Sequence, residues 1–345
     1  MVNLSEIRQA NAALKTATAP NGLTAVVVGG TAGIGRAFLT SLATATTNPK
    51  IYIVGRKPDV LSSIVADLKT LNATGTYIPV ETGDLTLVAV AHQTAQKILT
   101  GEAGGKIDIL FLSPGYITFS SREESSEGLD KALAVRFYSR MRFILDLLPL
   151  LEAKNASRPF PARVVTVLAG GSEATIFPDD LGLKEPAHQG VVTTAGIATT
   201  YTTMFLEQLA ARHTQVSFVH TYPGFVRGTN LFKSEHLGGL TRFLLNWMFM
   251  PALGRLMSIS ASESGERHLF IATDASFTPA GVMRADAAAV GSNGKIGSGA
   301  YIVGENAESK AAASERVMKP YREKAVDVLV YEHTLAEYRR ILETT

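Results

Sequence analysis

The sequence of 345 residues contains no cysteine, a single tryptophan and no run of lysine and arginine. The absence of cysteine excludes a disulfide scaffold and is typical of a protein from a reducing compartment. The formal charge of +2 is close to neutral, so the chain carries no basic footprint for nucleic acid. The first fifteen residues are too polar for the apolar core of a signal peptide. We therefore expect a cytoplasmic protein in which residues 1–20 form a helix or arm outside the first strand.

Long apolar runs are also absent, although one stretch approaches such a run. Leu240–Met257 is rich in leucine, phenylalanine and methionine. It is too short to span a bilayer, and Arg242, Pro251 and Arg255 interrupt it. Two interpretations stay open for the surrounding region, about 225–260. It is either a lid over the substrate or a subunit contact of a homodimer, or else a helix that lies on a membrane surface.

Short runs rich in valine and isoleucine alternate with segments of helical length. Apolar residues make up 46% of the chain, enough to bury a sizeable core. Strands that alternate with helices favour βαβ units, and continuously apolar strands are typical of a sheet covered on both faces. The sequence therefore predicts an α/β fold, a doubly wound Rossmann fold with a parallel sheet of about seven strands. The first six strands are expected at Leu23–Val28, Ile51–Val54, Thr76–Val80, Ile107–Leu112, Val164–Leu168 and Val216–Thr221.

The sequence indicates one domain, residues 21–345, whose C-terminal third carries additional elements outside the basic fold. Apolar residues at helical spacing predict the longest core helix from about Glu124 to Glu152. Beyond the lid region we expect a helix near Glu263–Ala272 and a short strand around Ala300–Val303. A C-terminal helix at about 323–342 completes the expected fold.

A glycine-rich turn follows the first expected strand and opens an amphipathic helix. In such a turn Gly29 permits the tight bend, Gly33 lets the backbone approach a pyrophosphate, and Gly35 allows close packing of helix and strand. The helix N-terminus then presents free N–H groups to the anion. Thr31 and Ile34 lie in the same turn, so we include them in the predicted cofactor site.

Two arginines suggest which dinucleotide is bound. Arg56 ends the second expected strand, where NAD-selective sites place an acidic residue for the ribose hydroxyls. The planar guanidinium of arginine suits a 2′-phosphate instead. Arg36, just after the last glycine, is expected near the same pocket. The pair predicts NADP(H) as cofactor.

Further turns complete the predicted cradle. Asp84-Leu85 follows the third strand, where an aspartate can accept a hydrogen bond from the adenine amino group. Ser113-Pro114-Gly115 follows the fourth strand and is expected to line the nicotinamide side.

These residues resemble the short-chain dehydrogenase/reductase family over roughly residues 22–225. The matching motifs are GGTAGIG, Asp84-Leu85, Ser113-Pro114-Gly115 in place of the family's N-A-G, and Pro223-Gly224 after the sixth strand. The segments IYIVGR, EGLD, YSRM, LLPLL, VLAGG, FVHTYPGFV and GSGAYI look like a fungal branch found in secondary metabolism. The resemblance implies a Rossmann fold, a nicotinamide cofactor and a role for Pro223-Gly224 in binding it.

The same resemblance implies a catalytic Ser, Tyr and Lys, and the chain departs from that set. The serine position holds Ala169, and Ser172 is only a loose substitute. None of the ten tyrosines has a lysine four residues later. The positions that align with the Tyr and Lys fall in Val191–Ala198, which offers Thr193 and Thr194. The family's helix asparagine aligns with Arg136.

The loss of this set narrows the chemistry that the chain can perform. Reduction of a ketone needs a proton donor, whereas hydride addition to an iminium carbon neutralises an existing charge. Reduction of a conjugated carbonyl is intermediate, because an enolate needs only a hydrogen-bond donor in a dry site. The polar candidates for such a role are Arg136 first, then Tyr116, Ser172 and Thr194.

Three functions follow from these features. The first is an NADPH-dependent reductase of a large apolar metabolite, acting on an iminium or conjugated carbonyl. The second is a non-redox cyclase, isomerase or pericyclase that orients a reactive intermediate. The third is a catalytically silent binding protein. The histidines lack the spacing of a metal site, and no G-x-S-x-G elbow is present, so we expect neither a metal enzyme nor a hydrolase.

Overall fold

The computed structural model describes residues 2–18, 22–116, 122–154, 158–227, 258–282 and 288–343. Seven strands form one sheet in the order β3-β2-β1-β4-β5-β6-β9, and every pair in it is parallel. The predicted doubly wound Rossmann fold is confirmed, and all seven expected strands are present. The strands are β1 Thr24–Val28, β2 Lys50–Gly55, β3 Thr76–Glu81, β4 Ile109–Leu112, β5 Arg163–Val167, β6 Ser217–Thr221 and β9 Ala300–Val303.

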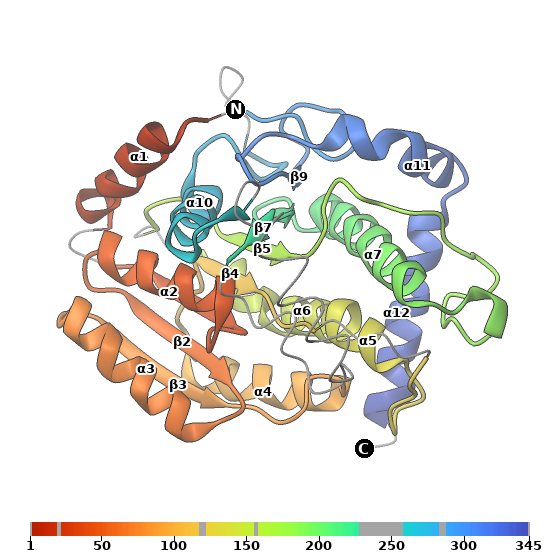
Figure 1. Ribbon diagram of the computed structural model, residues 1–345, viewed down its shortest axis with the longest axis horizontal. Coiled ribbons are helices and arrows are strands. Elements are labelled where there is room, and N and C mark those ends of the chain that lie inside the picture. The colour runs from red at the N-terminus through yellow and green to blue at the C-terminus, as the bar shows by residue number, and fades with distance from the viewer. Residues whose placement is uncertain are drawn as a thin grey trace.

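Helices cover both faces of this sheet, and each face has its own apolar cluster (Figure 1). The first face packs against α1 Leu4–Ala17, α2 Gly33–Ala45, α3 Pro58–Leu71 and α10 Ala261–Thr273. The second packs against α4 Val88–Gly101, α6 Ser139–Leu151, α7 Val191–Arg212 and α12 Val326–Glu343. Strands β1, β2 and β4 to β6 are buried almost throughout, as expected of strands covered on both faces, whereas β3 at the sheet edge buries only Tyr77 and Val80.

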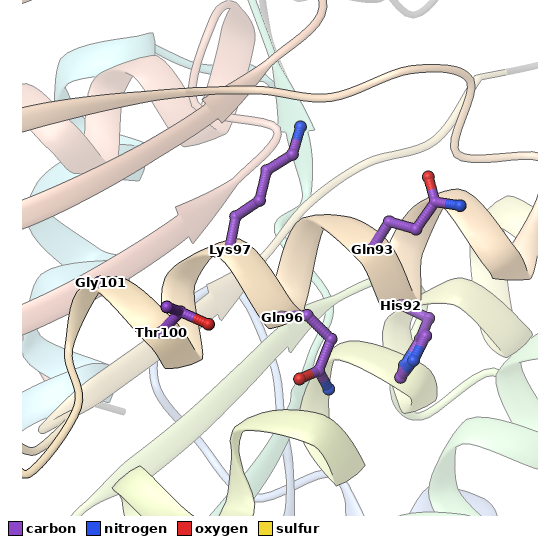
Figure 2. Close-up of a pocket in the computed structure, with 6 residues that line it drawn as sticks. All are labelled: His92, Gln93, Gln96, Lys97, Thr100 and Gly101. Atoms are coloured by element: carbon purple, nitrogen blue, oxygen red, sulfur yellow. The ribbon is translucent and has the colours of Figure 1, made fainter.

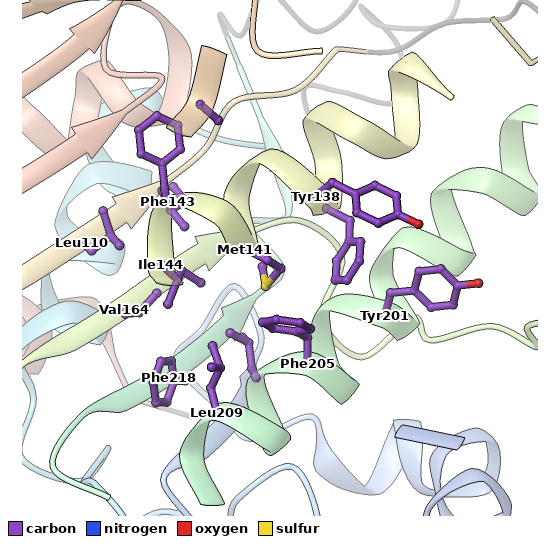
Figure 3. Packing of buried hydrophobic residues seen from close by; sticks show 14 of the residues in the cluster. Leu110, Tyr138, Met141, Phe143, Ile144, Val164, Tyr201, Phe205, Leu209 and Phe218 are labelled. Atoms are coloured by element: carbon purple, nitrogen blue, oxygen red, sulfur yellow. The ribbon is translucent and has the colours of Figure 1, made fainter. Parts of the chain in front are cut away.

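The second cluster is rich in aromatic rings from α6 and α7. Figure 3 shows Met141, Phe205 and Tyr201 packed between these two helices. Phe137 and Phe205 meet edge to face, with ring centroids 5.8 Å apart. This packing joins the segment just before α6 to α7.

The predicted long helix is wrong in two respects. It begins at Lys131 rather than Glu124, because Asp130 caps it by accepting a hydrogen bond from the amide of Leu133 (2.7 Å). It is also not regular: α5 Lys131–Leu133 is followed by a π-helical turn, Ala134–Tyr138, before α6 starts. Such a turn inserts one extra residue and changes which side chains share a face.

The C-terminal third contains more structure than the sequence predicted. The expected helix near Glu263–Ala272 is α10, and the helix expected at about 323–342 is α12. A further helix, α11 Ala311–Glu323, precedes α12 and was not predicted.

In the middle of the chain, the short helix η2 Pro186–His188 lies in the loop before α7.

Only the two ends of the predicted lid region lie within the described residues. Phe225–Val226 forms strand β7 and Ser258–Ile259 forms β8, and the two pair in parallel. The intervening residues 228–257, including Leu240–Met257, lie outside the described residues. None of the helices that the structure describes is long and apolar enough to cross a membrane.

Candidate dinucleotide and substrate site

The direction in which the chain builds the sheet reverses between β1 and β4. The chain winds from β1 to β2 and β3 on one side, and from β4 to β5, β6 and β9 on the other. In open parallel sheets, ligands bind at the carboxyl ends of the two strands where the winding direction reverses. The turn after β1 and the turn after β4 are therefore the walls of the candidate site.

The glycine turn after β1 leaves no room for side chains. Gly29 has φ +86°, and a Cβ there would lie 2.9 Å from the amide nitrogen of Pro114 and from Oγ of Ser113. A Cβ on Gly35 would lie 2.3 Å from the carbonyl oxygen of Gly29. Ala32 precedes α2 and makes no side-chain cap, so no side chain covers the first amides of that helix. These features fit a pyrophosphate at the helix N-terminus.

Gly35→Ala is expected to damage both the fold and the cofactor site. Its methyl group would displace the carbonyl of Gly29, so the unfolding free energy should fall by about 1–3 kcal/mol and the dinucleotide affinity at least about tenfold. Gly101→Ala is the matched control, since a Cβ in α4 meets only Tyr52 at 3.7 Å. Denaturant melts and dinucleotide titration of both variants measure the two effects. Wild-type affinity in a folded Gly35→Ala variant would contradict the assignment.

The two arginines predicted for the ribose phosphate differ in their surroundings. Arg36 donates from Nη2 to Oδ2 of Asp67 at 2.7 Å, which ties it to α3. Arg56 is exposed at the end of β2, and no described residue makes an ion pair or hydrogen bond with its side chain. The preceding residue, Gly55, packs against Thr31: a Cβ on Gly55 would lie 2.3 Å from the methyl group of Thr31. The end of β2 therefore adjoins the glycine turn.

The remaining predicted cofactor residues lie in turns at the same edge. Asp84 accepts a hydrogen bond from the amide of Thr86 (2.9 Å), and the carbonyl of Leu85 accepts one from Ser139 Oγ (2.8 Å). The amide of Ser113 donates to Val28 O at 3.0 Å, which joins the turn after β4 to β1. Gly224 has φ +68° and follows Pro223 at the end of β6. Ile34 lies in the first turn of α2.

A buried arginine fastens the turn after β4 to the end of β5. Arg140 is 2% exposed, and its Nη1 donates to Thr166 Oγ1 (3.0 Å) and to Val167 O (2.6 Å). Its Nη2 donates to the carbonyl of Pro114. Burial, followed by the charge of Arg136, lowers the pKa of Arg140 to about 9. Its charge is therefore met by the carbonyl and hydroxyl oxygens of these turns.

Arg136 binds the same segment two residues farther along, at Tyr116. It is 6% exposed, and its Nη2 donates to the carbonyl of Tyr116 at 2.8 Å. Its Nη1 is buried and has no hydrogen-bond acceptor among the residues that the structure describes. Burial lowers the pKa of Arg136, while Tyr116 and Asp130 act in the opposite direction. Burial and then Asp130 raise the pKa of Tyr116 to about 12, so its phenol stays protonated.

A surface hollow on α4 lies apart from these residues. Figure 2 shows that the residues lining it all come from this one helix, among them His92, Gln96 and Lys97. It contains no residue of the predicted site. No group of histidine and carboxylate side chains in the described ranges could hold a metal ion.

Comparison with known proteins agrees with this geometry. Residues 23–237 match the family model for short chain dehydrogenase. The chain is 37% identical to "Oxidoreductase AN1596" of Emericella nidulans over 343 residues, which cover 97% of each protein. It belongs to the short-chain dehydrogenase/reductase family.

Other relatives of this short-chain dehydrogenase/reductase are also fungal. "Oxidoreductase andH" of Emericella variicolor is 34% identical and covers 99% of the chain and 98% of its own length. "Short-chain dehydrogenase/reductase SAT2" of Stachybotrys chartarum is 27% identical, with 97% and 96% coverage. Among solved structures, the "Pseudomonas aeruginosa RhlG/NADP active-site complex" matches with a TM-score of 0.53 at 19% identity, over 74% of this chain and 91% of that one. The last match shows the fold alone.

The positions that align with the family's Ser, Tyr and Lys carry no strong acid or base in the described structure. Ser172 is exposed in a turn in which its amide donates to Ala169 O (2.9 Å). Thr194 is 9% exposed near the start of α7, where its amide bonds to Gly190 O (2.8 Å). Tyr201, farther along α7, donates its hydroxyl to Leu181 O at 3.1 Å. Tyr138 of the π-helical turn is fully buried and pairs with His333 of α12 at 3.0 Å.

The structure also joins residues that sequence patterns did not bring together. The carboxylate of Glu173, from the loop after β5, accepts hydrogen bonds from Thr203 Oγ1 (2.7 Å) and from Ser314 of α11. Thr203 Oγ1 also lies 2.8 Å from Nδ1 of His220, whose pKa burial lowers to about 3. With Arg140 bound to Thr166 on the neighbouring strand, these groups form a polar layer beneath the turns. No spacing rule relates residues so far apart in the sequence, so only the folded chain reveals the layer.

Proposed function

We propose that this short-chain dehydrogenase/reductase is an NADP(H)-dependent reductase of a large apolar metabolite. The observation that carries the proposal is the glycine turn after β1, which packs closely against Ser113 and Pro114 and fits a dinucleotide. When bound, NADPH supplies hydride from its nicotinamide ring. The turns that Arg140 and Arg136 hold would then face that ring. Exposed Val192 and Phe225, at the same edge of the sheet, favour an apolar substrate.

The acceptor group that suits this site is an iminium or a conjugated carbonyl. The aligned catalytic positions offer Ala169 and threonines in place of the Ser, Tyr and Lys set. An iminium requires no proton donor, and an enolate requires only a donor or cation such as Arg136. The test is to supply NADPH with a cyclic iminium, an enone and an isolated ketone, and to follow the loss of NADPH absorbance. We expect the first two to be reduced much faster than the ketone. Equal rates for all three would contradict the proposal.

The loss of acid–base residues also favours a second function, a cyclase, isomerase or pericyclase on the same scaffold. In that case product would form from a reactive intermediate at the same rate with or without NADPH. The homodimer, the cytoplasmic location, the single domain and the lid or membrane role of Leu240–Met257 stay predictions.

Arg56→Ala should lower the affinity for NADPH and leave that for NADH unchanged. A charged hydrogen-bonding contact contributes about 1.5–3 kcal/mol, so we expect a loss of at least about tenfold. Arg36→Ala is the matched control, because Asp67 already engages that guanidinium, and its effect should be smaller. Calorimetric titration measures both. An equal loss for NADPH and NADH in Arg56→Ala would assign Arg56 to some other part of the cofactor.

A further inference from the structure

The sheet pairing at the carboxyl end of β6 continues one residue beyond the strand. The amide of Tyr222 donates to Val303 O at 2.8 Å, and the amide of Leu168 donates to Thr221 O at 3.0 Å. Because Thr221 is in register with Val303, Tyr222 is next to Gly304 at this edge. Alternate residues of a strand share a face, so Tyr222 lies on the same face as His220, above the buried polar layer.

A lysine lies across the same edge. The amide of Lys310 donates to Ile302 O at 2.9 Å, which places Lys310 beside the end of β9. A Cβ on Gly304 would lie 2.5 Å from Cε of Lys310, and a Cβ on Gly171 would lie 2.8 Å from its Cβ. The two glycines therefore leave the space that the lysine side chain occupies. Gly171 belongs to the loop after β5, and Gly304 is the neighbour of Tyr222, so the lysine chain passes beside the position of Tyr222.

The charges around Tyr222 keep it a neutral donor. Burial and then Glu305 raise the pKa of Tyr222, whereas Lys310 lowers it. The ammonium of Lys310 also pairs with Glu308 at 2.9 Å, and that contact is the main reason its own pKa is raised. No residue in the described ranges hydrogen-bonds to the hydroxyl of Tyr222. The phenol is thus protonated near neutral pH and can act as a donor.

We propose that Tyr222 is the proton donor of this site and that Lys310 stabilises its phenolate. The inference rests on the proposed reductase function. When bound, NADPH would supply the hydride that forms a C–H bond at the β-carbon of a conjugated carbonyl, and the electron pair of the C=C bond would move to give an enolate. The O–H bond of Tyr222 would then break and its proton would pass to the enolate, with the dinucleotide left oxidised. The phenolate, beside the Lys310 ammonium, regains its proton from water. An iminium substrate bypasses the proton transfer.

The kinetic test compares Tyr222→Phe with Tyr331→Phe, which removes a phenol hydroxyl from α12. With NADPH and an enone probe, Tyr222→Phe should lower turnover by about a hundredfold or more, the range of general acid catalysis. Reduction of an iminium probe and affinity for NADPH should be unchanged, and Tyr331→Phe should resemble wild type with both probes. Wild-type enone turnover in Tyr222→Phe, or an equal loss with both probes, would overturn the assignment.

A second readout does not depend on activity. NMR of ring-labelled tyrosine, with Tyr222→Phe to assign the signal, gives the titration of Tyr222. Lys310→Met should raise that pKa and Glu305→Gln should lower it, because the first removes a cation and the second an anion. An unchanged titration in Lys310→Met would overturn the pairing. If wild type reduces no probe, the proposed function is contradicted, and this titration still decides whether Lys310 acts on Tyr222.

Discussion

Replacing Arg140 with methionine should weaken NADPH binding about a hundredfold while leaving the affinity for 2′,5′-ADP nearly unchanged. The guanidinium holds Pro114 O after β4 and both Thr166 Oγ1 and Val167 O on β5. Without it, these buried acceptors lose their donor, at a cost of about 1–3 kcal/mol for each unsatisfied group. The turn on the nicotinamide side should then lose its position. The fragment 2′,5′-ADP lacks the nicotinamide half and reports only on the glycine turn and Arg56.

Arg163→Met is the matched control for Arg140→Met. Arg163 is also a fully buried arginine of this sheet, and it donates to the carbonyls of Ile271 (2.9 Å) and Phe277 (2.6 Å) at the opposite end of β5. It should lower stability without changing the ratio of the two affinities. Thr166→Val gives a milder test, since it removes one acceptor and keeps the shape. If Arg140→Met weakens both ligands equally or neither, Arg140 does not position the nicotinamide half.

Arg136→Ala should lower turnover of the enone probe about a hundredfold or more, in line with the loss of one electrostatic donor. Its Nη1 is a buried donor that finds no acceptor within the described ranges, and Asp130 acts on it only at longer range than an ion pair. A buried cation without a carboxylate partner is costly unless a ligand meets it. The lysine variant should be impaired as well, because an ammonium does not reproduce the guanidinium fork.

Arg142→Ala is the control for Arg136→Ala on the same helical segment. Arg142 pairs with Asp146 four residues later and is placed outside the polar layer. Turnover in Arg142→Ala should stay near that of wild type. Turnover near wild type in a folded Arg136→Ala variant would remove Arg136 from the reaction and leave Tyr116 and Tyr222 as the donors to compare.

The sequence was sufficient for the sheet because local chemistry determines it. Strand β1 is a run of apolar residues followed by glycines, and no other element type explains that order. The start of the long core helix was mispredicted because Glu124 and Asp130 are both reasonable first-turn residues. The folded chain decides between them through a local contact: Glu124 pairs with Asp130 in a β-bridge, and the helix begins after it.

The spacing of apolar residues along the sequence could not predict the π-helical turn. Ala134–Tyr138 has the same apolar spacing as an ordinary helix, and in the folded chain this turn carries Phe137, which packs on Phe205, and Tyr138, which pairs with His333. The juxtaposition of Tyr222 and Lys310 likewise could not be predicted, because it arises only when β9 pairs with β6 and brings Lys310 to the same edge. A search for a tyrosine four residues before a lysine examines one helix and therefore misses them.

The proposed function depends on the binding of NADP(H) by the glycine turn after β1 and Arg56. The most direct measurement is a calorimetric titration of the wild-type chain with NADPH and with NADH. We expect NADPH to bind more tightly than NADH by at least about tenfold, the contribution expected of one charged contact to the 2′-phosphate. Equal affinities, or no binding of either dinucleotide, would contradict it.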